Sequence, residues 1–396
     1  MTAGLYYLPP GSHFARDLAE GLRRRMAGAP PEDMARVRLY LNARRTGRAV
    51  TEALEAAAPA AYLPRIAYVS ALDEEAAKAG LPGWTGEGLR RLFALTALVE
   101  AFLRAEPGFG APSDAPALAT SLQTLMDELQ GAGLGVQDLR ALDLGEHAVH
   151  WEKASRFLAI AAEHWPRHLE EAEDGALDPE ARRLAAVQAQ AASWRAAPPA
   201  SPVIAAGSTG STPATAALLE AISNLQNGAV VLPGWDPDMP RDVWEALADG
   251  AAPEHPHAHL AALVRRLGGD RHAPRPWLED AASDTPRLRL LCEALRPAPV
   301  TDAWVARRKT LAEWVEPAIE TCALIEAPTL REEAAAVAAA LAAEALDGSG
   351  RAALVTPDRA LARRVTAELA RWNLTPDDSA GRPLGLTPPG VFLGLL

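Results

Sequence analysis

The sequence predicts an α/β protein that is built on a parallel sheet and carries a helical insertion. Strand-like apolar segments alternate with helical patterns at both ends of the chain, which is typical of βαβ units. Between residues 81 and 195, four helical stripes follow one another without a convincing strand. Apolar residues make up 49% of the 396-residue chain. A typical domain has roughly 100–200 residues, so we expect more than one packed unit.

The N-terminal part predicts three strands and two helices. Apolar segments of strand length occupy Gly4–Leu8, Arg36–Leu41 and Arg65–Val69. Apolar residues at helical spacing predict helices over Phe14–Met26 and Thr46–Ala58. Right-handed crossovers between such strands produce a parallel sheet.

The stretch Ser201–Ile222 organises the rest of the chain. An apolar strand, Val203–Ala206, is followed by the small-residue loop Gly207–Ser211 and by a helix. Thr212 is the expected N-cap of that helix, and Pro213 suits its first position. A strand, a loop and a capped helix in this order direct backbone N–H groups toward an anion.

The C-terminal part predicts the beginning of a second α/β domain. After a strand at Ala229–Leu232, helices are expected at 257–267, 285–295 and, as a connector, 304–319. Strands at Cys322–Ile325 and Ala352–Thr356 then alternate with helices over 330–346 and 361–372. The final apolar pattern stops at Leu396, so we expect a longer parent protein.

Composition limits the classes of function. No run of about 18 uncharged apolar residues is present, the N-terminus lacks a signal-peptide pattern, and there are two cysteines, so a cytoplasmic protein without membrane contact is expected. The net charge of −12 argues against nucleic-acid binding over the whole surface, and any such contact must be local.

The chain has only three lysines among its 39 basic residues, Lys78, Lys153 and Lys309, and none follows a glycine. A Walker A loop requires G-x-x-x-x-G-K-[ST], because its lysine reaches the β- and γ-phosphates. A conventional P-loop ATPase is therefore excluded.

A basic loop is the strongest sign of a binding site. Arg44, Arg45 and Arg48 follow the second predicted strand, with Thr46 as the expected N-cap of the next helix. In an open α/β sheet, ligands bind at this end of the strands. Arginines beside helix-terminal N–H groups suit a phosphate backbone. A solvated first helical turn explains the same residues equally well.

Other polar residues give weaker signals. Asp236 could hold a metal at a strand end, but a turn carboxylate is the favoured interpretation. The histidines of Glu254–His259 are two residues apart and do not share a helix face, and His164 and His168 have no third ligand, so surface histidines are expected. No nucleophile elbow is present.

Four stretches resemble the AddB subunit of the bacterial AddAB helicase–nuclease, with the alphaproteobacterial branch most similar. They are LYYLPPGSHFARDLAEGL, LNARRTGRAVTEAL, AAGSTGSTPATAALLEAI with AVVLPGWD, and AALVTPDRALARRVTAELARWNLTPDDSAGRPLGLTPPG. The resemblance covers essentially the whole chain as the N-terminal part of a longer protein.

The resemblance implies a P-loop-like, superfamily 1 helicase-like fold that has lost its motor chemistry. Pro10, Gly11 and Ser12 stand at the Walker A position without its lysine, and Ala206, before Gly207, stands where Walker B carries an aspartate. The implied division is a first half of domain 1A (1–80), a helical insertion (81–195), a second half of 1A (196–285), a helical connector (286–320) and the start of domain 2A (321–396).

The resemblance also implies function. The subunit pairs with an AddA-type helicase–nuclease partner in double-strand break repair by homologous recombination, and it guides single-stranded and end-bearing double-stranded DNA. The implied DNA contacts are Arg44, Arg45, Thr46, Arg48, Ser208 and Thr209. This chain is expected to lack ATPase and nuclease activity alone. The iron–sulfur cluster and magnesium of the family belong to a C-terminal nuclease region.

Two other functions fit the residues. A free-standing Rossmann-like enzyme would use Gly207–Ser211 to hold a nucleotide or a sugar phosphate. A protein–protein scaffold would make no DNA contact.

Overall fold

The computed structural model describes residues 3–59, 61–69, 89–140, 148–172, 175–280, 285–348 and 352–395. The expected boundary between residues 80 and 81 lies outside these ranges. The chain forms two compact units, Met1–Ala318 and Ile319–Leu396.

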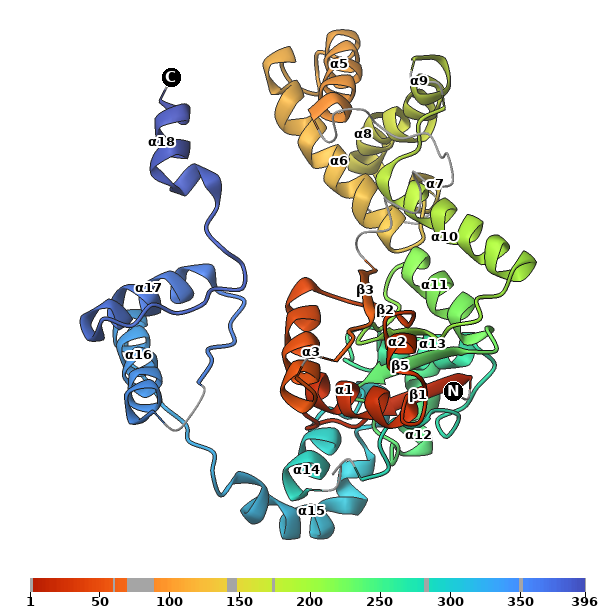
Figure 1. The fold of residues 1–396 in the computed structure, drawn as a ribbon. Coiled ribbons are helices and arrows are strands. Elements are labelled where there is room, and N and C mark those ends of the chain that lie inside the picture. The colour runs from red at the N-terminus through yellow and green to blue at the C-terminus, as the bar shows by residue number, and fades with distance from the viewer. Residues whose placement is uncertain are drawn as a thin grey trace. The chain divides into compact units, whose positions relative to one another are not determined.

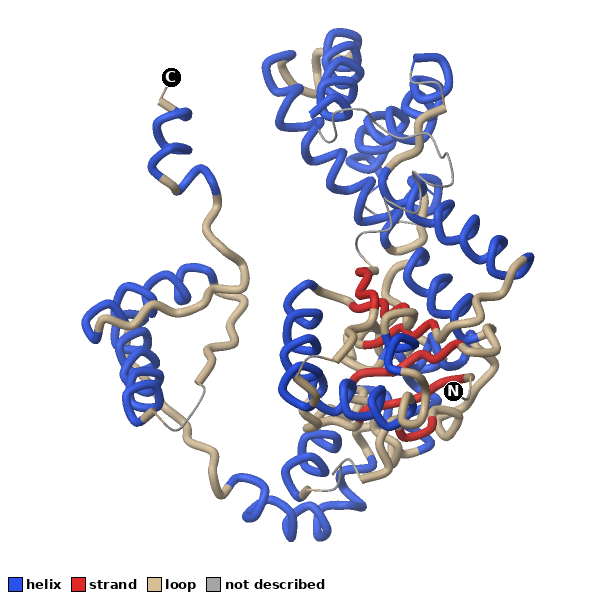
Figure 2. The backbone as a smooth tube through the Cα atoms, viewed as in Figure 1, coloured by secondary structure: helices blue, strands red, loops and turns tan. Residues whose placement is uncertain are grey.

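Six parallel strands form the centre of the first unit, in the order β3-β2-β4-β5-β1-β6 (Figures 1 and 2). They are β1 (Gly4–Leu8), β2 (Arg38–Leu41), β3 (Arg65–Tyr68), β4 (Val203–Ala206), β5 (Gly228–Pro233) and β6 (Arg275–Pro276). The predicted parallel α/β fold is confirmed, and β1 and β4 have the predicted bounds. Strand β6 was not predicted, because its two residues are arginine and proline and both are exposed.

The register explains why the central strands are apolar throughout. Leu39 of β2 lies between Ile66 of β3 and Ile204 of β4. Residues in register on parallel strands point to the same face, and the next residue points to the other face. Both faces are covered by helices, so β4 is buried at all four positions.

The helices α1 (Phe14–Arg25) and α3 (Arg44–Ala57) cover one face of the sheet. Their Leu18, Leu22 and Val50 pack against alternate strand residues such as Leu39. The opposite face is covered by α10 (Pro179–Ala196), α11 (Pro213–Ser223), α12 (Arg241–Ala248) and α13 (Ala258–Arg266). Complete burial of one such leucine contributes about 1.5–3 kcal/mol.

The chain between β3 and β4 is helical in all its described elements. They are α5 (Leu89–Ala105), η1 (Pro112–Asp114), α6 (Ala115–Gly131), α7 (Val136–Arg140), α8 (Ala148–Ala159), a π-helical turn at Ile160–His164, α9 (Trp165–Ala172) and α10. Leu95, Val99, Leu122 and Trp165 form its core. The described residues from 89 to 196 contain no strand, as the helical stripes predicted.

The first unit ends in helices beyond the sheet. They are α14 (Pro286–Ala294), η4 (Ala298–Val300) and α15 (Ala303–Ile319). The short helix α2 (Pro31–Met34) lies much earlier in the chain and precedes β2. The expected helices near 285–295 and 304–319 are present, and Thr285 caps the first of them by accepting a hydrogen bond from Leu288 N.

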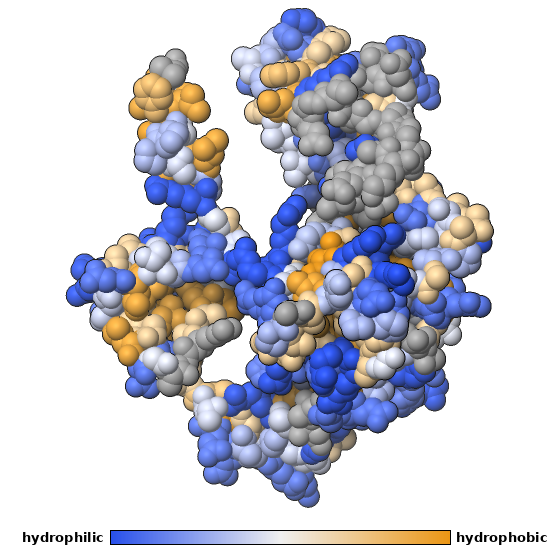
Figure 3. Space-filling model, in the orientation of Figure 1, coloured by the Kyte–Doolittle hydropathy of each residue, from blue (hydrophilic) through white to orange (hydrophobic). Residues whose placement is uncertain are grey.

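The second unit contains α16 (Leu330–Asp347), α17 (Arg359–Leu369), η5 (Ala370–Trp372), η6 (Leu384–Leu386) and α18 (Pro388–Gly394). Ala334, Ala338 and Ala342 of α16 pack closely against Val365 and Leu369 of α17. Apolar side chains also gather on the surface over these two helices (Figure 3).

The predicted strands at Cys322–Ile325 and Ala352–Thr356 are wrong. Both segments lack strand pairing, and Leu324 and Val355 are 86% and 94% exposed. An apolar sequence of strand length becomes a strand only when another strand supplies backbone partners. The described residues of this unit supply none.

The longest helices that the structure describes, α10 and α16, have 18 residues each. No helix in the described ranges combines the length and apolarity needed to cross a membrane.

Candidate nucleic-acid interface

The carboxyl ends of β2 and β4 form a topological switch point. The chain leaves β2 through α3 on one face of the sheet and leaves β4 through α11 on the other face. Adjacent loops that diverge in this way open a crevice, which is the usual ligand site of open α/β sheets. The basic loop and the small-residue loop of the sequence therefore meet at one edge.

The loop after β1 is a tight turn. Ser12 N donates to Pro9 O at 3.2 Å, and Gly11 has a φ of +78°. α1 begins at Phe14 with His13 as its N-cap, and no side chain caps it. Pro10 and Ser12 are half-buried, and the turn has no side chain that could replace the phosphate-binding lysine.

The basic loop starts α3 earlier than predicted. Ala43 is the N-cap, with extended backbone and no side-chain hydrogen bond, so Thr46 lies inside the first turn and its prediction as N-cap is wrong. Gly47 N bonds to Ala43 O, which fixes the start of the helix. Arg44 and Arg48 are exposed and one turn apart.

No carboxylate partner is recorded for Arg44 or Arg48 within the described part of the chain, and Arg45 is exposed beside them. The guanidinium groups of Arg44 and Arg48 thus flank a helix start whose N–H groups have no side-chain cap. This combination offers charge and hydrogen-bond donors to phosphate oxygens.

Arg44 also contacts an aromatic ring. Its guanidinium carbon lies 5.4 Å from the centre of the Tyr68 ring, at the end of β3. The Tyr68 hydroxyl lies over Gly47, where a Cβ atom would be only 2.5 Å away. In the sequence, the only sign of this aromatic contact is the position of Tyr68 near the end of a predicted strand.

The loop after β4 is packed against the other two loops. A Cβ atom on Gly207 would lie 3.1 Å from Phe14 Cζ and 3.3 Å from Asn42 Oδ1. Gly207 has a φ of +78°, which glycine adopts without strain. The Phe14 ring therefore fills the space beside Gly207, and Ala206 before it is buried.

Internal hydrogen bonds use part of the predicted anion cradle. Thr212 is the N-cap of α11, as predicted, and its Oγ1 accepts from Thr215 N at 3.3 Å. Ser208 is buried, and its hydroxyl accepts a long bond of 3.4 Å from Gly210 N. Thr209 is half-buried. The arginines of α3, rather than this loop, present the accessible donors.

The loop after β5 is stabilised by local contacts. Asp236 Oδ1 accepts from Asp238 N at 2.9 Å, which is the arrangement of a turn carboxylate. Burial, followed by the nearby Asp236 carboxylate, raises the pKa of the Cys292 thiol to about 12. Cys292 is therefore a neutral thiol near pH 7.

Two histidines belong to this loop region and not to the open surface. His257 Nε2 lies 2.7 Å from Gly234 O, and His255 Nδ1 accepts from His257 N at 3.0 Å. Both side chains are half-buried, so the expectation of surface histidines is wrong for them and for the half-buried His168, although it holds for His164 and His259. Among the residues with described positions, no group of three or more His, Cys, Asp or Glu side chains could hold a metal ion.

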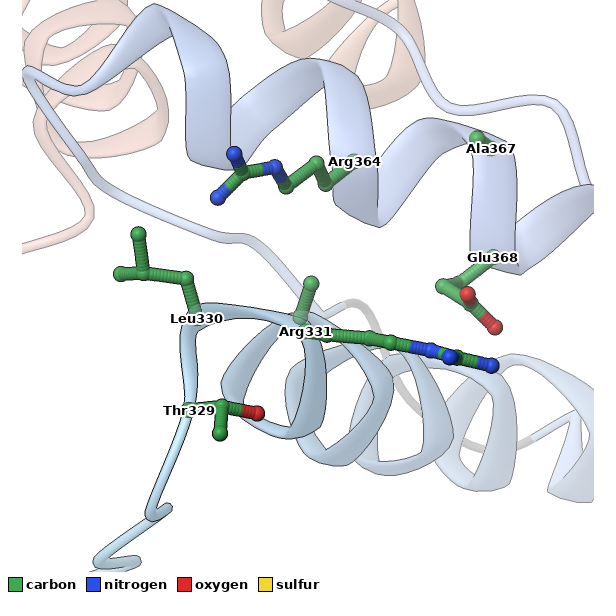
Figure 4. Close-up of a pocket in the computed structure, with 7 residues that line it drawn as sticks. Thr329, Leu330, Arg331, Arg364, Ala367 and Glu368 are labelled. Carbon is green, nitrogen blue, oxygen red and sulfur yellow. The ribbon is translucent and has the colours of Figure 1, made fainter.

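The second unit has a depression of about 550 Å³ between α16 and α17. Figure 4 shows the Arg331 side chain of α16 extending below Glu368 of α17, with Arg364 also on α17. Thr329 Oγ1 already accepts from Glu332 N, so the start of α16 is capped. The carboxylate and the cap make this depression a poorer anion site than the edge of the sheet.

No protein-family model matches the sequence, and no curated protein matches it significantly.

Proposed function

We propose that this chain is a non-motor, DNA-guiding module of a helicase–nuclease that acts in double-strand break repair by homologous recombination. The observation that supports it best is the α3 start, where Arg44, Arg45 and Arg48 surround an uncapped helix terminus at a topological switch point. The assignment to an AddAB-type complex and to an AddA-type partner rests on the resemblance of the four sequence stretches.

A backbone-reading mode fits this edge better than a base-reading mode. Exposed arginines and helix N–H groups bind phosphates without regard to sequence, and they position a strand. Arg44 is further restrained by the Tyr68 ring, so its guanidinium loses less conformational freedom when it binds.

The loops at the carboxyl ends of the strands also support the proposal that this chain has no ATP-driven motor activity. The loop after β1 is a closed turn without lysine, and the Phe14 ring lies against Gly207 where a nucleotide site would need an open backbone. Ala206 supplies no metal-binding carboxylate. These features favour a helicase-like P-loop core without nucleotide chemistry over a Rossmann-like enzyme that uses Gly207–Ser211.

Binding of a labelled single-stranded oligonucleotide across a salt series tests the proposal. We expect log Kd to depend linearly on log salt, and the double variant Arg44→Gln/Arg48→Gln should reduce the slope by about 0.7 per lost phosphate contact. The matched control is Arg363→Gln/Arg364→Gln, which removes the same charge from exposed positions of α17. The proposal fails if the wild-type chain does not bind or if both double variants change the slope equally.

A further inference from the structure

A second cluster of arginines lies at the opposite, amino edge of the sheet. Arg36, Arg38 and Arg65 line a pocket of about 240 Å³ together with the segment Pro199–Val203. The candidate DNA contacts lie at the carboxyl ends of the strands, so the two arginine clusters are separate features of the sheet.

The register places two of these arginines side by side. Arg38 of β2 and Arg65 of β3 are direct partners across the parallel pair, so their side chains leave the sheet on the same face. Like charges at paired positions of neighbouring strands destabilise a sheet. In the described part of the chain, neither guanidinium has a recorded carboxylate partner that would offset this repulsion.

Hydrogen bonds and an ion pair with neighbouring segments fix the walls of the pocket. Arg65 Nε donates to Ala35 O at 3.1 Å, and Arg36 is paired with Asp33 at 2.8 Å. Arg38 N donates to Pro202 O at 3.0 Å, which holds the Pro199–Val203 wall against β2. Arg38 and Arg65 both line the pocket, where Arg38 is half-buried and Arg65 is exposed.

We infer that this pocket binds a phosphate group, held between the guanidiniums of Arg38 and Arg65. Guanidinium groups bind phosphate oxygens in a bidentate manner, and an anion between two of them replaces their repulsion by attraction. The volume is below the roughly 300–1,000 Å³ of pockets for drug-sized ligands, so it suits a phosphate with few attached atoms. Inorganic phosphate and the terminal phosphate of a nucleic-acid strand share this chemistry.

Isothermal titration of the full chain with inorganic phosphate, at constant ionic strength, tests the inference. We expect saturable binding with one site per chain, and at least a tenfold loss of affinity in Arg38→Gln and in Arg65→Gln. Arg308→Gln, at an exposed position of α15, removes the same charge and should leave the affinity unchanged. The absence of saturable binding, or equal weakening by all three variants, would overturn the inference.

Thermal unfolding separates ligand binding from a structural role. Phosphate should raise the Tm of the wild-type chain but not that of Arg65→Gln, because only a ligand-binding native state is stabilised by mass action. Without phosphate, Arg65→Gln should have an equal or higher Tm, because a like charge has been removed. Arg38→Lys keeps the charge but loses the planar fork, so it should bind phosphate with intermediate affinity. A Tm gain that persists in Arg65→Gln contradicts the assignment.

Two oligonucleotides distinguish the sources of the phosphate group. If a 5′-phosphorylated strand binds more tightly than its 5′-hydroxyl counterpart, and Arg65→Gln abolishes the difference, the pocket takes a strand end. If phosphate binds but the two strands bind equally, the ligand is a small phosphate. These outcomes do not depend on Arg44 or Arg48, so they are independent of the proposed DNA-guiding function.

Discussion

At the scale of single residues, Gly207 determines how closely the three loops of the carboxyl edge can approach. It combines a positive φ with contacts to Phe14 and Asn42. Gly11 has the same φ of +78° but no atom within 4 Å of its Cβ position. Substituting each glycine by alanine therefore separates two contributions to stability. Both substitutions strain the backbone, but only the one at Gly207 also crowds its neighbours.

We predict that Gly207→Ala destabilises the chain by about 1–3 kcal/mol more than Gly11→Ala, because only the first substitution overpacks its surroundings. Gly11→Ala should itself cost about 1 kcal/mol, for the left-handed backbone. Urea unfolding of both variants measures the difference. Equal costs would show that the Phe14 ring moves away without penalty.

His255 makes stability depend on pH. Burial, followed by the neighbouring His257, lowers the pKa of His255 in the folded chain. A group whose folded pKa is lowered takes up its proton more readily when unfolded, so stability is complete above the ordinary histidine pKa of about 6.5 and is lost as the pH falls below it.

We therefore predict that the free energy of unfolding declines between about pH 6.5 and pH 5, by at most about 1.4 kcal/mol per pH unit from this group. His255→Asn keeps an acceptor near the Nδ1 position but does not titrate, so its stability should decline less over the same interval. Urea titrations at several pH values provide the measurement. Parallel curves for the wild type and the variant would contradict this role of His255.

At the scale of elements, a buried ionic cluster joins the helices between β3 and β4. Arg91 of α5 forms an ion pair with Asp178, the residue before α10, at 2.9 Å, and with Asp127 of α6 at 2.6 Å. Asp178 Oδ2 also accepts from Trp165 Nε1 and Gln130 Nε2. The side chains of Arg91 and Asp178 are 3% and 6% exposed, whereas Asp127 is 40% exposed.

We predict that Asp178→Asn destabilises these helices by about 3–5 kcal/mol, because it removes one charge of a buried pair and leaves the other. Asp127→Asn is the matched control on the exposed side of Arg91, and it should cost at most about 1 kcal/mol. Urea unfolding of both variants, followed by circular dichroism, measures the difference. If both variants lose the same free energy of unfolding, the buried ion pair contributes no more to stability than the exposed one, which contradicts the prediction.

At the scale of the whole molecule, the sequence predicts the sheet better than it predicts the site. β1 and β4 agree with their predicted bounds because each lies between two other strands, where apolar composition and strand length suffice. The same signal fails at Cys322–Ile325 and Ala352–Thr356, because composition does not reveal whether a partner strand is present. Helix starts follow local chemistry, so Thr212 was found. The prediction of Thr46 as a helix N-cap failed, because α3 begins after Ala43, which has no side-chain cap.

The site could be predicted only in part. The basic residues of α3 were visible as a motif, since strand ends at a parallel sheet share one edge. The contact of Phe14 with Gly207, the Tyr68 ring beside Arg44 and the pairing of Arg38 with Arg65 depend on which strands are neighbours. Strand order is a property of the complete fold, and no local pattern encodes it.

Hydrogen exchange of the full chain, measured by mass spectrometry with and without a single-stranded oligonucleotide, tests the central claim most directly. We predict slower exchange in peptides that cover residues 42–48, with the loop 207–211 protected to a lesser degree because its donors are partly used internally. Magnesium and ATP should leave these peptides and residues 9–13 unchanged. Bound DNA that leaves residues 42–48 unprotected, or protection of residues 9–13 by magnesium and ATP, would contradict the account.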